Sequence, residues 1–219
     1  MSKLYKLTDE NGKTGVKFKN TLQWGVGVTH TAKGEGKKLC TDGVIHAYED
    51  PLIAVFMNPI HRKFAASLLW EAEGEVVVRS GQTQCGVKTL TTVRKIPVPE
   101  ITLEQRVRFA IFCALEVFKE KDFACWAQKW LSDEDRSAEA AESIWLSCIM
   151  RVVQASNIEA ARWAAQAAAA SFAAGTACAS AKASSAWAAE TAAEAALASN
   201  AWTGCNFNLS RLAEQAILL

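Results

Sequence analysis

The sequence lacks the short motifs that mark many nucleotide-dependent and hydrolytic enzymes. It contains no GxxxxGK phosphate loop, no GxSxG nucleophile elbow and no HExxH zinc motif. The stretch "WGVGV" at 24–28 has two glycines of a dinucleotide-binding pattern without the third, which is a weak signal. These absences argue against P-loop NTPases, hydrolases built on that elbow and HExxH metalloproteases.

The sequence also shows no sign of a secretory leader, and we expect none. The first residues, "MSKLYKLTDENGK", have no apolar core. The longest uncharged run, 163–181, is mostly Ala and Ser and contains Gln166 and Gly175, so it suits a lipid core poorly. The seven cysteines are an odd number without a CxxC pair. We therefore expect no membrane span, reduced thiols and a cytoplasmic location.

Histidine and proline are scarce, and all three His and all four Pro lie before residue 100. Residues 1–99 hold fourteen Lys and Arg against nine Asp and Glu, a net charge of +5. Residues 100–219 hold ten against fourteen, a net charge of −4. The modest positive charge of the first part suits a phosphate-bearing small ligand, and we expect no long nucleic acid as a partner.

The first part of the chain shows the alternating pattern of β-strands. Along 67–78, Trp70 and Ala72 share one face, while Glu71 and Glu73 share the other. Two prolines in "IPVPEI" then indicate a domain boundary near residue 99. We predict a β-rich domain over 1–98 with a small mixed sheet. Its expected strands cover 4–7, 14–18, 22–30, 43–48, 67–78 and 88–98.

The second part, 100–219, has helical spacing. Thr102 and Gln105 form a capping-box signature, and Asp122 is the expected cap of a helix that carries Trp126 and Trp130. A further helix is expected over 132–154, with acidic residues in its first turns, and Asn157 is the expected next cap. Gly175-Thr176 is expected to end one Ala-rich helix and start another, which runs to about residue 200, before a last helix over 208–218.

The fold class that follows is α+β: a small mixed β-sheet domain followed by an all-α bundle. About half of the residues at 155–201 are Ala, so these helices can pack closely. Exposed Trp-rich or Ala-rich faces would be costly in water, and we expect a homo-oligomer that forms through the helical half.

Candidate metal and catalytic residues are few. Cys40, His46, His61 and Cys85 have irregular separations, and we expect neither a metal nor a cofactor. The alternating glutamates at 71, 73 and 75 are interpreted as a solvated strand face. We therefore name no catalytic residue.

A candidate ligand site surrounds the basic glycine loop "AKGEGKK" at 32–38 and the strand end before Asp50-Pro51. The loop lysines suit phosphate, an aromatic ring suits a base, and His46 suits a ribose or phosphate oxygen. A helix that begins at Pro51 would add backbone N–H groups. The plain alternatives remain a solvated loop, a core Trp and a structural His. The candidate residues are Trp24, Lys33, Lys37, Lys38, His46 and Tyr48.

Two segments, "KLCTDGVIHAYEDPLIAVFMNP" and "FAASLLWEAEGEVV", resemble an uncharacterised domain of tailed-phage proteins with a K-x-C-x-x-G-H-A-C-E-x-P-L segment. The resemblance covers about residues 15–98, and Val44-Ile45 is one residue longer than that pattern. The Ala-rich half is similar to helical domains labelled immunity proteins. The matching residues are Lys38, Cys40, Gly43, His46, Ala47, Glu49, Pro51, Leu52, Phe64, Ala65, Glu71, Ala72, Gly74 and Glu75.

A more distant resemblance is to the core of ADP-ribosyltransferases, with Tyr48 near their nicotinamide-stacking aromatic. The strand corresponding to the one with their catalytic Glu, at 89–97, has no Glu here. The resemblance therefore implies a nucleotide pocket without transfer chemistry. We expect a phage protein that sequesters a nucleotide immune signal in the infected host, such as a cyclic ADP-ribose-like molecule or a cyclic oligonucleotide. The alternatives are an inhibitor of a host defence protein, and a divergent ADP-ribosyltransferase or nucleotide-degrading enzyme.

Overall fold

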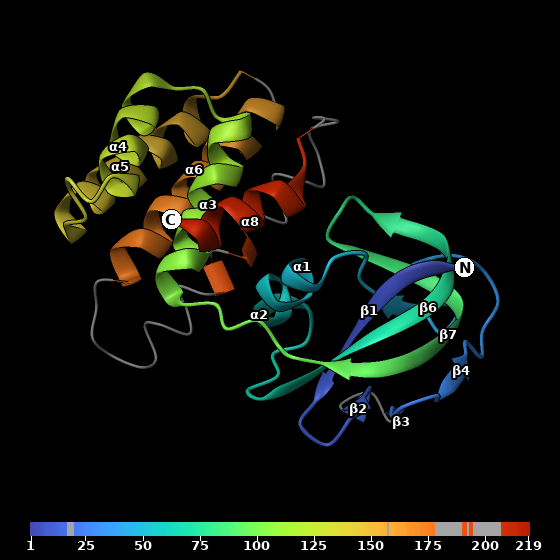
Figure 1. Ribbon diagram of the computed structural model, residues 1–219. Coiled ribbons are helices and arrows are strands. Elements are labelled where there is room, and N and C mark those ends of the chain that lie inside the picture. Colours follow the sequence, from blue (N-terminus) through green and yellow to red (C-terminus); the bar gives the residue numbers. More distant parts are fainter. Residues whose placement is uncertain (17–19, 157, 178–189, 192, 195–206) are drawn as a thin grey trace. The chain divides into compact units, whose positions relative to one another are not determined.

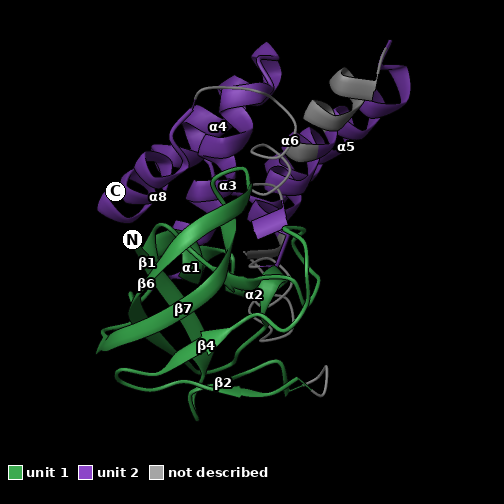
Figure 2. Cartoon of the chain, turned by 90° about the vertical axis from the view of Figure 1, so that its right-hand side faces the viewer, with its two compact units in different colours: residues 1–100 green, residues 101–219 purple. Residues whose placement is uncertain are grey.

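The chain folds into two compact units, Met1–Glu100 and Ile101–Leu219 (Figure 2). The computed structural model describes all residues except 17–19, 157, 178–189, 192 and 195–206 (Figure 1). Strands and two short helices form the first unit, and helices form the second. The predicted α+β class, with the sheet before the helices, is confirmed.

The first unit, called the β unit here, is built on a five-stranded sheet. Its strand order is β1-β6-β7-β4, and β5 pairs with the first residues of β7, on the same edge as β4. All described strand pairs are antiparallel, so the sheet is not the mixed one that we expected. The strands are β1 (Ser2–Asp9), β4 (Thr29–Thr31), β5 (Ile45–Ala47), β6 (Ser67–Ser80) and β7 (Gln84–Ile96), with β2 (Lys13–Thr14) and β3 (Leu22–Gln23) in a separate pair.

The long β6–β7 hairpin is the centre of the sheet. Trp70 and Ala72 are buried and Glu73 is exposed, which confirms the predicted alternation. The pairing of β6 with β7 shifts register at three places, so the hairpin is bulged and twisted. Core residues from four strands and a loop pack on one another: Leu4, Trp24, Ile45, Ala47, Ala72, Cys85, Val87 and Leu90.

Two short helices follow β5: α1 (Pro51–Phe56) and α2 (Asn58–His61). Asp50 caps α1, because its carboxylate accepts the backbone N–H groups of Leu52 and Ile53 at 2.7 and 3.1 Å. The helix start predicted from Asp50-Pro51 is confirmed. Each helix is at most six residues long.

The second unit, the helical unit, begins at the predicted capping box of Thr102 and Gln105, which is confirmed. Two helix starts differ from the prediction. Glu120, rather than Asp122, occupies the N-cap position of α4, and α5 starts only after Ser137, whose hydroxyl accepts the Ala140 N–H. The helices are α3 (Leu103–Val117), α4 (Lys121–Leu131), α5 (Ala138–Gln154), α6 (Ile158–Ala177) and α8 (Leu209–Leu218).

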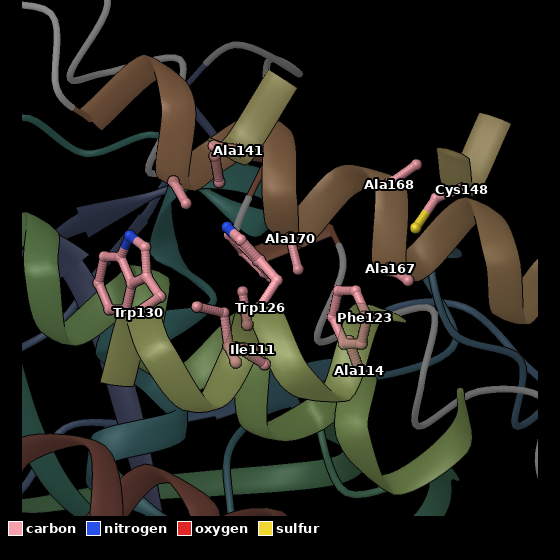
Figure 3. Packing of buried hydrophobic residues seen from close by; sticks show 14 of the residues in the cluster. Ile111, Ala114, Phe123, Trp126, Trp130, Ala141, Cys148, Ala167, Ala168 and Ala170 are labelled. Atoms are coloured by element: carbon pink, nitrogen blue, oxygen red, sulfur yellow. The ribbon is translucent and has the colours of Figure 1, made fainter. Parts of the chain in front are cut away.

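The core of the helical unit combines large aromatic residues with alanines (Figure 3). Trp126 and Trp130 of α4 lie in this cluster with alanines of α6. Gly175 does not end a helix, since α6 continues to Ala177. A Cβ at Gly175 would lie 3.4 Å from the Cβ of Ala141, so the glycine lies where α5 and α6 approach closely. The Asn157 cap and most of the Ala-rich helix predicted beyond Gly175 lie outside the described residues.

Two further expectations can be compared with the structure. In the part of the chain that the structure describes, no helix is long and apolar enough to cross a membrane. Cys40, Cys85, Cys113, Cys125 and Cys148 are free thiols, as predicted. Cys178 and Cys205 lie outside the described residues.

Candidate ligand-binding site

The β unit contains a cavity of about 630 Å³. Described residues of β1, β2, β3, β4, β5, α2 and the loop between β4 and β5 line it. The volume lies within the roughly 300–1,000 Å³ that small-molecule sites occupy. Five basic side chains reach its wall: Lys6, Lys33, His46, His61 and Arg62.

Lys6 of β1 is the most buried of these cavity residues, with 4% of its surface exposed. Its Nζ donates to the backbone oxygen of His46 at 2.6 Å and lies 5.0 Å from the centroid of the Trp24 ring. No ion pair joins Lys6 to a carboxylate among the described residues. Burial, together with the charge of Arg62, holds the pKa of Lys6 well below its ordinary value.

His46 of β5 is neutral at pH 7. Its Nε2 accepts the backbone N–H of Cys40 at 3.1 Å, so this nitrogen carries no proton and Nδ1 is the donor. Burial lowers the pKa of His46 to about 4, and the charges of Arg62 and Lys6 act in the same direction. Cys40 itself has a left-handed backbone with φ of 61°, which is uncommon outside glycine.

His61 ends α2 and is held by Tyr48. The two rings stack with centroids 6.0 Å apart, and the Tyr48 hydroxyl is 3.3 Å from Nδ1 of His61. Burial, followed by the charge of Arg62, lowers the pKa of His61 to about 4. Burial raises the pKa of Tyr48 to about 12, so this phenol remains protonated. Backbone hydrogen bonds to Tyr5 fix Tyr48 against β1.

Arg62 follows His61 and is half-buried. One guanidinium nitrogen donates to the His61 backbone oxygen at 3.3 Å. Its positive charge lowers the pKa values of Lys6, His46, His61 and Tyr48, which identifies it as the cation shared by this group. Like Lys6, it has no ion pair with a carboxylate in the described part of the chain.

The loop between β4 and β5 closes one side of the cavity. Lys88 of β7 fixes this loop by donating to the backbone oxygens of Gly43 and Gly34 at 2.7 and 3.3 Å. Gly34 N–H donates to the Asp42 backbone oxygen at 2.9 Å, and a side chain at Gly34 would collide with the Asp42 carboxylate. Asp42 carries the only carboxylate among the described lining residues, and it is exposed.

The six predicted ligand residues fall into three groups. Lys33 and His46 line the cavity, whereas Lys37 and Lys38 are exposed and absent from the described lining. Trp24 and Tyr48 are each only 2% exposed. Trp24 donates from Nε1 to Thr14 Oγ1 at 2.9 Å and packs edge-on against His30. The base-stacking role predicted for Trp24 or Tyr48 therefore has no open ring face.

Two further expectations concern the surroundings of the cavity. The start of α1 is not available to a phosphate, because Asp50 already accepts the N–H groups of Leu52 and Ile53. Among the described residues, no group of three or more His, Cys, Asp or Glu is arranged to hold a metal ion. The Cys40 N–H also occupies the Nε2 lone pair of His46 that a metal would need.

Three basic residues of the cavity were not among the predicted ligand residues: Lys6, His61, which was considered only as a metal ligand, and Arg62. Lys6 did leave a signal, because it stands between Leu4 and Thr8 on the inward face of an alternating strand. His61 and Arg62 end a four-residue helix whose sequence has no pattern that would predict their direction.

Comparison with known protein families, curated proteins and solved structures finds no match for the chain. The resemblances to a tailed-phage domain, to ADP-ribosyltransferases and to immunity proteins therefore stay predictions.

Proposed function

We propose that the β unit binds a phosphorylated small molecule of the nucleotide type in its cavity and does not convert it. The observation that supports this most is that the buried amine of Lys6 and the guanidinium of Arg62 line the cavity without a carboxylate partner in the described structure. A buried charge without a counter-charge costs several kcal/mol. A phosphate group would supply the missing negative charge, and a guanidinium can bind it through two parallel hydrogen bonds.

The lining suits the phosphate and sugar of a nucleotide better than its base. Lys33 adds a third cation at the wall, and the neutral His46 has an N–H that can donate to a ribose or phosphate oxygen. A base would meet the imidazole rings of His46 and His61 and the side chains of Leu22 and Val44. We therefore assign most of the binding free energy to the phosphate contacts.

Binding without conversion is favoured by the composition of β7. This strand reads "QCGVKTLTTVRKI" and carries no carboxylate that could stabilise a developing oxocarbenium ion. In the setting of the tailed-phage resemblance, the role would be sequestration of a nucleotide immune signal, such as a cyclic ADP-ribose-like molecule or a cyclic oligonucleotide. A protein with this role returns its ligand unchanged when it is unfolded.

Calorimetry with ADP-ribose, ADP, cyclic ADP-ribose and a cyclic dinucleotide tests the proposal. Lys6→Met and Arg62→Gln should each weaken binding of whichever nucleotide binds, by about tenfold or more, since a charged hydrogen bond is worth about 1.5–3 kcal/mol. Lys37→Gln and Lys38→Gln remove the same charge outside the described lining and should leave affinity nearly unchanged. Chromatography of the ligand released by heat should recover it intact.

Two results would contradict the proposal. If no nucleotide in the panel binds, the cavity does not serve this ligand class. If a nucleotide binds, its affinity is compared among the variants. An equal loss of affinity in the Lys37 and Lys38 variants and in the Lys6 and Arg62 variants would show that cations outside the cavity hold the ligand. If the ligand released by heat is cleaved or transferred to another molecule, the protein is an enzyme rather than a binding protein.

The helical unit supports a second proposal, self-association through α5. Four apolar residues of α5 at i, i+3, i+4 and i+7 are 37–75% exposed: Leu146, Ile149, Met150 and Val153. This spacing forms one stripe along a helix, of the kind that packs against another helix. A second copy of the chain is the partner that we propose, because two-fold homo-oligomers are the commonest assemblies and can pair identical stripes.

Light scattering of the intact protein tests self-association. A Leu146→Lys/Met150→Lys variant should fall to the monomer mass, while Val93→Lys, which alters an exposed apolar residue of the β unit, should not change the mass. A monomer mass for the unaltered protein at micromolar concentration would remove this proposal. The stripe would then favour the alternative of a different protein partner, such as a host defence protein.

A further inference from the structure

Lys6 has an environment that suits covalent chemistry as well as charge pairing. Its amine is buried at the cavity wall, near the cation Arg62 and without a carboxylate among the described residues. Burial and a neighbouring positive charge both favour the neutral amine over the ammonium form. A neutral lysine amine is a nucleophile that attacks carbonyl groups.

The contacts of Nζ position this amine and leave it able to react. One N–H donates to the His46 backbone oxygen at 2.6 Å, and the Trp24 ring lies on another side with its centroid 5.0 Å away. Neither contact uses the nitrogen lone pair. The amine is thus oriented by a hydrogen bond that it donates, which leaves the lone pair for a carbon atom in the cavity.

We propose that Lys6 forms a reversible imine with a free carbonyl group of the bound ligand, so that the cavity selects phosphorylated reducing sugars. This rests on the proposed function, and it narrows the ligand class to molecules that carry both a phosphate and an aldehyde or ketone. ADP-ribose, through the open form of its terminal ribose, and ribose 5-phosphate belong to this class. Arg62 and Lys33 would hold the phosphate while Lys6 meets the carbonyl carbon.

The reaction balances without an oxidant or reductant. The Nζ lone pair attacks the carbonyl carbon to give a carbinolamine, and the nitrogen loses two protons in all. These protons leave with the former carbonyl oxygen as water, and a C=N bond replaces the C=O bond. The neutral imidazoles of His46 and His61 line the same cavity and can relay a proton to the departing oxygen. Hydrolysis reverses the step and releases the ligand unchanged.

Other lysines of the β unit lack this combination. Lys88 donates to two backbone oxygens, and Lys3 forms an ion pair with Glu71 at 3.1 Å. Lys33 lines the cavity but is exposed to water rather than buried. Lys6 is therefore the amine that should react first, and Lys37, outside the described lining, is the control.

The experiment is reductive trapping on the intact protein. The protein is incubated with ribose 5-phosphate or ADP-ribose and cyanoborohydride, which reduces an imine to a stable amine, and the modified lysine is located by mass spectrometry. We expect Lys6 to be modified ahead of every exposed lysine. Lys6→Arg, which keeps a basic side chain but cannot form the imine, should lose the adduct, whereas Lys37→Arg, outside the described lining, should keep it. Excess ADP, which has no carbonyl, should protect Lys6.

The outcomes separate this inference from the function on which it rests. Adducts spread over exposed lysines, with the same pattern in urea-unfolded protein, overturn the imine. If ADP binds by calorimetry while Lys6 stays unmodified, the imine is refuted and the nucleotide site stands. If ADP-ribose and ADP both fail to bind and Lys6 stays unmodified, both proposals fall. The site of modification in the unaltered protein is decisive even if Lys6→Arg does not fold.

Discussion

Acidification should weaken the β unit through His46 and His61. Both imidazoles have pKa values of about 4 in the folded protein, against an ordinary value of 6.5. Between these two values the unfolded chain binds protons that the folded chain does not, so stability falls as the pH drops from about 6.5 towards 4. The stability that the two neutral histidines contribute is fully lost below their folded pKa and fully present above about pH 6.5.

The magnitude follows from the size of the pKa difference. One pKa unit corresponds to about 1.4 kcal/mol, so each histidine contributes about 3 kcal/mol over the whole range. At pH 5 unfolded histidine is almost fully protonated and folded histidine is almost wholly neutral, which leaves a loss of about 2 kcal/mol for each. The pair should therefore cost the β unit at most about 4 kcal/mol between pH 7 and pH 5.

The assay is urea unfolding at pH 7 and pH 5, followed by hydrogen exchange in peptides from β6 and β7, which report on the β unit. The control is a His46→Gln/His61→Asn variant. Gln can accept the Cys40 N–H, and Asn can bond to the Tyr48 hydroxyl. The variant should lose far less stability than the unaltered protein at pH 5. Equal losses in the two proteins would refute the argument, because the pH dependence would then come from other groups.

Three further predictions follow from named contacts. A phosphate ligand should raise the pKa values of His46 and His61, so binding should take up protons and become tighter from pH 7 to pH 5. Calorimetry in buffers of different ionisation enthalpy measures this proton uptake. If no uptake is found, the phosphate lies away from both imidazole rings. Gly43→Ala should cost about 1–3 kcal/mol in urea unfolding, because a Cβ there meets the backbone oxygens of Glu35 and Gly36, whereas Gly25→Ala meets only Val28 at 3.5 Å and should be nearly neutral. Thr102→Ala should cost the helical unit about 1 kcal/mol through loss of the capping box, while Thr102→Ser should not.

The sequence predicted those structural features that are set by residues close together in the chain. The alternation along β6, the Asp50 cap and the Thr102 capping box each need only a few adjacent positions, and all were found. The stretch 22–30 was expected to be one strand, but the structure has two short strands there, separated by Gly25 and Gly27. Gly175 was interpreted as a helix end, since the close approach of α5 that requires a small residue there cannot be inferred from neighbouring residues.

The cavity was only partly predictable for a related reason. Lys6, His46 and Arg62 are far apart along the chain, and they meet only because β1, β5 and the residues that end α2 line the same cavity. The sequence shows that Trp24 and Tyr48 are aromatic, but their burial depends on which neighbours cover them. Lys33 lines the cavity whereas Lys37 and Lys38 of the same loop do not, and the three have the same chemistry, so the sequence alone could not separate them.

The position of Lys6 beside Trp24 gives the cavity an optical reporter of its own. The indole of Trp24 is buried, and Nζ of Lys6 lies 5.0 Å from its ring centroid, so its emission is sensitive to the charge state of that amine. A ligand that draws Nζ away, neutralises it or joins to it changes the electric field at this ring. Ligand binding in the cavity, as proposed, should therefore give a fluorescence signal without a dye, and a Trp24→Phe variant would identify the part of the signal that comes from this site.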